Sequence, residues 1–237
     1  MKSGIFLFVT IAILLTNVIC NAQVEEADQT LIFQPFPTGM IETKSLPPAT
    51  IEGTYYLEES WQVGDIFLKD GNALKRTPLK YDLEHNTMEI YTKRGVKILY
   101  SDKIKQFSWT NTHGITQHYV NTDLFESKED IPAGFFEIIT EGHYSLVNKK
   151  DIEYVKPNYS EIHDAGNKNG RYVHSDKYFY IVGNKVYKLP KSKKSFLGIF
   201  GDKSAKVAAY MKENKFGHKD QYELRKIFEY YNSLLTS

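Results

Sequence analysis

Short stretches of alternating apolar and polar residues follow one another between residues 61 and 190. Leu79, Tyr81 and Leu83, for example, are separated by single polar residues. A period of two places every second side chain on the same face of an extended strand, so this pattern is typical of strands with one buried face. The sequence therefore restricts this part of the chain to a fold built mainly from β-strands.

The connections between these stretches are short and carry residues that favour tight turns. Asp70-Gly71, Lys93-Arg94-Gly95 and Gly183-Asn184 each stand between two apolar runs. Glycine and asparagine adopt the backbone conformations that two-residue hairpin loops require. We therefore expect an antiparallel meander of about nine or ten strands, which is too many to remain flat, so the expected architecture is a closed barrel or a sandwich.

The last part of the chain changes from the period of strands to that of helices. One helix is predicted from Ser204 to about Asn214, and a second begins near Asp220. The apolar positions of the second helix form a stripe at helical spacing, which indicates a helix that packs against the sheet. They are Leu224, Ile227, Phe228, Tyr231, Leu234 and Leu235. The predicted fold class is therefore α+β, with two or three C-terminal helices packed on the strands.

The first residues have the features of a secretory signal peptide. A run from Ile5 to Ile19 is mostly apolar, follows Lys2 and precedes small residues that end at Ala22. We expect cleavage near Ala22 and an exported product, either periplasmic or secreted. Two alternatives remain open, namely an uncleaved anchor, which Asn17 interrupts, and lipidation of Cys20.

Cleavage near Ala22 would determine the chemistry of the mature chain. Cys20 is the only cysteine, so its removal excludes both a disulfide and a cysteine nucleophile. Loss of Lys2 from 30 basic residues leaves 29 basic residues against 29 acidic ones. A neutral chain has no overall attraction for nucleic acid, and we therefore predict no nucleic-acid partner.

Three regions are expected along the chain. Residues 1–22 are the signal peptide. Residues 23–55 contain several prolines and lack periodicity, so we predict an extended, partly ordered leader. Residues 56–237 are expected to form a single β-rich domain, with strands to about residue 190 and helices over about 192–235.

The sequence contains no established motif for a nucleophile, a metal or a cofactor. Accordingly, no cofactor is predicted. His163 and Asp164, together with His174 and Asp176, flank a polar loop, and His163, Asp164 and His174 are the candidates among them. Such side chains can act as an acid, a base or a zinc ligand, so these three are the candidate catalytic residues if the protein is an enzyme.

Two segments suggest binding surfaces. Tyr178 and Tyr180 lie in an aromatic run, and rings on a β-sheet face can stack against sugars or peptides, so they are a possible ligand platform. Residues 191–203 contain an apolar patch, Phe196 to Phe200, between lysines. A patch of this kind can make weak contact with a membrane surface, but the favoured interpretation is a short connecting helix packed into the core.

Three motifs also carry a resemblance to known proteins. Trp61-Gln62-Val63-Gly64, Leu79-Lys80-Tyr81-Asp82 and the closing Tyr230-Tyr231-Asn232-Ser233-Leu234, combined with an export signal, resemble exported β-rich bacterial proteins of no assigned function. The resemblance covers about residues 55–235. It implies a structural role for these motifs and transfers no functional residue.

These observations favour an exported, non-catalytic envelope protein that binds or scaffolds another component. The expected partner is an envelope protein or a glycan. A hydrolase or metal-dependent enzyme that uses His163, Asp164 and His174 remains an alternative, as does a factor that acts at a membrane surface through residues 191–203.

Overall fold

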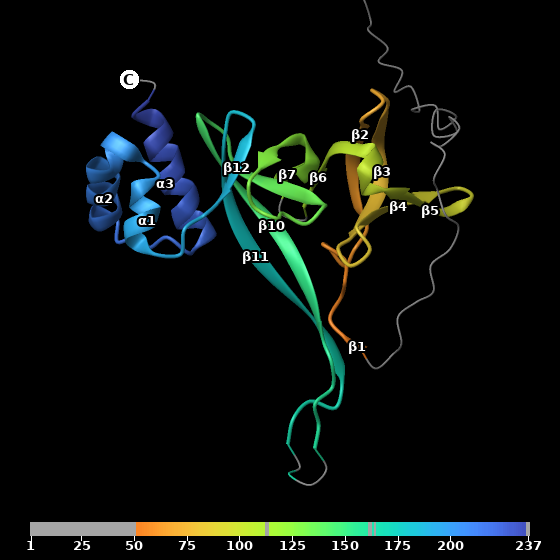
Figure 1. Ribbon diagram of the computed structural model, residues 1–237. Coiled ribbons are helices and arrows are strands. Elements are labelled where there is room, and N and C mark those ends of the chain that lie inside the picture. The colour runs from red at the N-terminus through yellow and green to blue at the C-terminus, as the bar shows by residue number, and fades with distance from the viewer. Residues whose placement is uncertain (1–50, 112–113, 161–162, 164, 236–237) are drawn as a thin grey trace, which may run out of the picture. The chain divides into compact units, whose positions relative to one another are not determined.

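A computed structural model describes residues 51–235, except 112–113, 161–162 and 164. Figure 1 colours this part of the chain from orange to blue. The predicted signal peptide and nearly all of the predicted leader lie outside the described residues.

The described residues contain twelve strands in one mixed sheet. The hydrogen-bonded order is β5-β4-β3-β2-β6-β7-β9-β10-β11-β12-β8, and β1 pairs with β11 beside this path. The strands are β1 Ile51–Glu52, β2 Gln62–Leu68, β3 Ala73–Asp82, β4 Thr87–Thr92, β5 Gly95–Tyr100, β6 Ile104–Thr110, β7 Thr116–Asn121, β8 Glu126–Ser127, β9 Phe135–Thr140, β10 Tyr144–Val155, β11 Gly170–Val182 and β12 Lys185–Lys188.

The helices follow the last long strands, as the sequence predicts. The α-helices are α1 Lys193–Gly198, α2 Ser204–Glu213 and α3 Gln221–Ser233, and the short 3-10 helices are η2 Ser101–Lys103, η3 Thr122–Leu124 and η4 Gly201–Lys203. The predicted α+β class with C-terminal helices is therefore confirmed.

The predicted closure of the sheet into a barrel is wrong. The sheet path begins at β5 and ends at β8, and these two strands are not neighbours. Closure was expected because many strands need cover for their apolar face. In the structure the helices provide part of that cover, since α3 contacts both β9 and β10. The sheet is also mixed, because β1 with β11 and β8 with β12 pair in parallel.

One apolar cluster lies inside the curved half of the sheet, which runs from β5 to β9. It contains thirteen buried residues, all but one of them from the strands of this half and including Ile66, Phe107 and Trp109. The ring of Phe107 stacks on that of Tyr119, with centroids 4.5 Å apart and planes 11° apart. Closely packed rings of this kind stabilise the cluster beyond the area that they bury.

The longest pairing in the sheet joins β10 to β11. Twelve residue pairs connect them, from Tyr144 with Val182 to Val155 with Arg171, and Figure 1 shows the two strands as a continuous twisted ribbon. Side chains alternate across this ribbon. Leu146 therefore faces the helices, and its neighbour Val147 packs into a separate cluster on the other face of the sheet.

The three α-helices form a second apolar cluster against β10. Phe196, Phe200 and Phe228 are fully buried there. The start of α3 is defined by Asp220, whose side chain accepts a hydrogen bond of 3.1 Å from the Glu223 backbone N–H. Such a cap satisfies a backbone donor that the helix itself leaves unpaired.

The end of α3 is attached to the sheet by one side chain. Asn232 Oδ1 accepts a hydrogen bond of 3.0 Å from the Tyr144 backbone N–H, and Asn232 Nδ2 donates one of 2.9 Å to the Tyr144 carbonyl. A Cβ at Gly142 would lie 2.2 Å from Asn232 Nδ2, so only glycine leaves room for this contact. The closing motif around Asn232 therefore has a structural role.

We expect Phe228→Ala to lower the free energy of unfolding by about 3 to 5 kcal/mol, because it leaves a cavity at the centre of the helical cluster. Urea unfolding followed by circular dichroism measures this change. Tyr222→Ala is the matched control, since Tyr222 is an exposed ring on the same helix, and it should cost less than about 1 kcal/mol. Equal losses in the two variants would contradict this account of the helical cluster.

Candidate functional site

Two of the three candidate catalytic residues, His163 and His174, are among the described residues. His163 is exposed in the segment that joins β10 to β11, and Asp164 lies outside the described residues. His174 is in β11, where its Nε2 lies 2.6 Å from the carbonyl oxygen of Thr54. This contact holds His174 against the chain that follows β1. The structure therefore brings His174 to a backbone carbonyl, and a converging site with His163 and Asp164 stays a prediction.

No group of three or more histidine, cysteine, aspartate or glutamate residues within residues 51–235, apart from the five positions left undescribed, is placed to hold a metal ion. No helix in this part of the chain is long and apolar enough to cross a membrane.

The apolar residues of segment 191–203 serve the interior of the protein. Phe196 and Phe200 are fully buried, and Leu197 and Ile199 are partly buried against the helical cluster. A membrane-contact surface needs these side chains exposed. Packing in the core, the favoured interpretation of this segment, is the one that the structure supports.

Tyr178 and Tyr180 are partly buried beside the helical cluster, and their role as a ligand platform stays a prediction. The Tyr178 hydroxyl donates a hydrogen bond of 3.3 Å to Gln221 of α3, and burial together with nearby Asp176 raises the Tyr178 pKa to about 12. Tyr180 lies between two rings that are nearly parallel to its own, with Tyr144 5.8 Å away on one side and Tyr187 5.2 Å away on the other. Both residues therefore belong to packing beside the helices.

A row of polar side chains crosses the central strands between the two apolar clusters. Trp109 Nε1 donates a hydrogen bond of 3.0 Å to Gln117, whose Nε2 donates another of 3.0 Å to Glu137. Glu137 on β9 is paired in register with Asn148 on β10, and Asn148 is fully buried. The row therefore places the carboxylate of Glu137 in the interior.

The row continues from Asn148 to the surface. Asn148 Nδ2 donates a hydrogen bond of 2.7 Å to Asp176 on β11, and Lys150 Nζ lies 2.8 Å from the same carboxylate oxygen. Asn148 Oδ1 is buried without a hydrogen-bond partner among the described residues. Such an atom costs about 1 to 3 kcal/mol, so this row lowers stability locally.

The pKa values of the two carboxylates in the row are shifted in opposite directions. Burial raises the pKa of Glu137, although hydrogen bonding from Gln117 and the charge of Lys150 oppose the shift. The pKa of Asp176 is lowered despite its partial burial, because Lys150 and Asn148 donate to it. Both shifts have a structural cause in the row itself.

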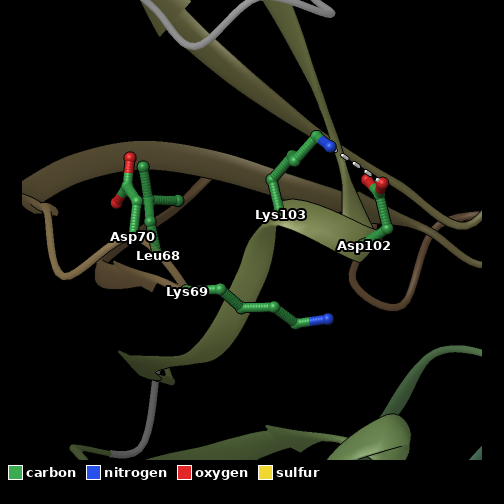
Figure 2. A pocket seen from close by; sticks show the side chains of 5 residues that line it. All are labelled: Leu68, Lys69, Asp70, Asp102 and Lys103. Carbon is green, nitrogen blue, oxygen red and sulfur yellow. Dashed lines mark ion pairs between the residues drawn. The ribbon is translucent and has the colours of Figure 1, made fainter.

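A surface hollow of about 360 Å³ lies where β2 ends beside η2. Figure 2 shows its lining, which comes from Leu68, Lys69, Asp70, Asp102 and Lys103. Asp102 pairs with Lys103 at 3.2 Å, and Lys69 pairs with Asp123. Because both lysines already have carboxylate partners, the hollow offers little unmatched charge to a ligand.

Aromatic side chains are exposed on the outer face of β2 to β4. Trp61, Val63 and Tyr91 are 37%, 57% and 56% exposed, although large apolar side chains usually gain from burial. The rings of Trp61 and Tyr91 meet edge to face, with centroids 5.8 Å apart and planes 67° apart. We call Trp61, Val63 and Tyr91 the aromatic face.

A lysine and a carboxylate lie beside the aromatic face. Lys80 Nζ is 4.4 Å from the ring centroid of Tyr56 and 5.5 Å from that of Trp61. The Tyr56 hydroxyl donates a hydrogen bond of 2.9 Å to Glu89, the buried cross-strand partner of Lys80. The face therefore combines open rings with fixed polar groups, which is typical of ligand-binding surfaces.

The sequence contained a signal for this face that is easily missed. Ile66 and Leu68 alternate into the core from β2, as Met88 and Ile90 do from β4. Val63 and Tyr91 are out of phase with these core residues and must point outward. An apolar residue at an outward position is the informative observation, whereas the run with Tyr178 and Tyr180 shows only a high density of aromatic residues.

Comparisons with protein-family models, with curated proteins and with solved structures find no match.

Glu137→Gln should change the dependence of stability on pH. The pKa of Glu137 is raised in the folded state. Its contribution to the free energy of unfolding is therefore complete below the ordinary glutamate pKa and is lost as the pH rises through the pKa of the folded state. We therefore expect the difference in free energy of unfolding, Glu137→Gln minus wild type, to increase from about pH 4 to about pH 8. Urea titrations at each pH measure it.

Asp176→Asn is the control of opposite sign. Because the pKa of Asp176 is lowered, its contribution is present above the ordinary aspartate pKa and is lost as pH falls through the folded value. The loss in free energy of unfolding that Asp176→Asn causes should therefore become smaller as the pH falls. Difference curves with the same sign of slope for the two variants would contradict the assigned shifts.

Proposed function

We propose that the mature chain, exported after cleavage near Ala22, is a non-catalytic binding protein of the bacterial envelope and that its ligand is a glycan. The aromatic face supports this proposal. Trp61, which directly precedes β2, and Tyr91 on β4 remain exposed beside strands whose other side is well packed, so their position is not explained by the needs of the core.

The chemistry of the aromatic face suits a sugar ring. The faces of aromatic rings carry partial negative charge, and sugar C–H bonds present partial positive charge to them. Hydroxyl groups of the same sugar need hydrogen-bonding partners, which the ammonium group of Lys80 can supply beside Trp61. Stacking and hydrogen bonding are thus available within one small surface.

The small extent of the aromatic face favours a glycan over a protein partner. Specific protein interfaces bury about 800 Å² on each partner and contain about 20 residues a side. The exposed rings and Val63 form a compact patch bordered by charged strand residues such as Asp65. A patch of this extent matches a few sugar units.

Titration of the mature protein with soluble chito-, cello- and manno-oligosaccharides and muropeptide fragments tests the proposal through tryptophan emission. The chain has two tryptophans, and Trp109 is buried, so a ligand on the aromatic face should perturb Trp61. Tyr91→Ala should weaken binding about fivefold or more, because an aromatic contact is worth about 1 kcal/mol. Calorimetry should show loss of binding in Trp61→Ala.

Tyr222→Ala is the matched control for Tyr91→Ala. Tyr222 is 55% exposed, almost the same as Tyr91, but lies on α3. Its removal should leave the affinity unchanged. The proposal fails if no member of the panel gives a saturable change in emission, or if Tyr222→Ala weakens binding as much as Tyr91→Ala does.

A further inference from the structure

We propose that Lys80 makes the aromatic face selective for acidic sugars, by pairing its ammonium group with a uronate carboxylate. This inference rests on the proposed glycan-binding function and adds the ligand class. Its basis is the ammonium group of Lys80, which lies on the outer face of β2 to β4 beside Tyr56 and Trp61.

The position of Lys80 is defined by the rings beside it. Its ammonium lies over the rings of Tyr56 and Trp61 at once, and the side chain is partly buried. Contact with two rings restricts the side chain, so less entropy is lost when a ligand binds. The charge is thus held next to Trp61, on which a sugar would stack.

The carboxylates on the same face already have partners. Glu89 accepts the Tyr56 hydroxyl, and Asp65 accepts Lys75 Nζ at 3.0 Å and the Arg76 backbone N–H at 2.9 Å. Lys80 has no hydrogen bond or ion pair to any residue that the structure describes. The three N–H donors of its ammonium are therefore available to an anionic group.

A sugar carboxylate satisfies both features of this surface. Its ring can stack on Trp61 or Tyr91, and its carboxylate can accept charge-assisted hydrogen bonds from Lys80 Nζ. A neutral sugar of the same shape keeps the stacking and loses the charged contact. The expected selectivity is about tenfold, which is the value of one hydrogen bond to a charged group.

The test compares each acidic oligosaccharide with its own methyl ester. Trimers of galacturonate, mannuronate and glucuronate and their fully esterified forms are titrated into the mature protein at low ionic strength, with Trp61 emission as readout. At least one acid should bind about tenfold more tightly than its ester, and added salt should reduce this difference. Lys80→Met should abolish the difference while the ester keeps its affinity, and Lys80→Arg should preserve it.

Lys185→Met is the control lysine, because Lys185 is exposed on β12. It should leave the preference for acid unchanged. Equal affinity for acid and ester in every pair, a preference for the ester, or retention of the acid preference in Lys80→Met would overturn the role of Lys80 and leave glycan binding intact. Absence of binding by every acid and ester, together with failure of the neutral panel, would overturn the proposed function and this inference together.

Discussion

The pairing of β10 with β11 is the constraint on which the rest of the structure depends. Twelve consecutive residue pairs fix one register, and side-chain alternation then assigns every position of both strands to a face. Leu146 meets the helices, Val147 meets the opposite cluster, and Asn148 enters the polar row. A slip of one residue would exchange these environments and place an amide in an apolar cluster, so the register and the packing on both faces stabilise each other.

The polar row and the helix attachment use the same strand for different purposes. Asn232 binds the Tyr144 backbone at the start of β10, where it holds α3 on the sheet. Asn148, four residues further along, connects the buried Glu137 with the half-exposed Asp176. Hydrogen bonds are directional, whereas apolar contacts tolerate small shifts, so these amides define where the helices and strands meet.

The aromatic face is separate from the polar row and from the attachment of α3. Tyr91 belongs to β4, Val63 to the start of β2, and Trp61 directly precedes β2. Their side chains point away from the cluster that the other side of these strands forms. A surface that contributes little to the core can change without loss of the fold. This separation suits the proposed binding function, because one face of the sheet forms the core and the proposed ligand contacts the other.

Local order in the sequence determined the strand-rich zone, the Gly183-Asn184 hairpin and the two longer helices, since periods of two and 3.6 residues depend only on neighbours in the chain. The alternation along β2 and β4 also indicates that Val63 and Tyr91 point outward. Only the tertiary structure decided that the sheet stays open, that β2 pairs with β6 and β8 with β12, and that Lys80 lies between Tyr56 and Trp61. These outcomes depend on contacts between residues far apart in the chain, and such contacts leave no periodic trace in the sequence.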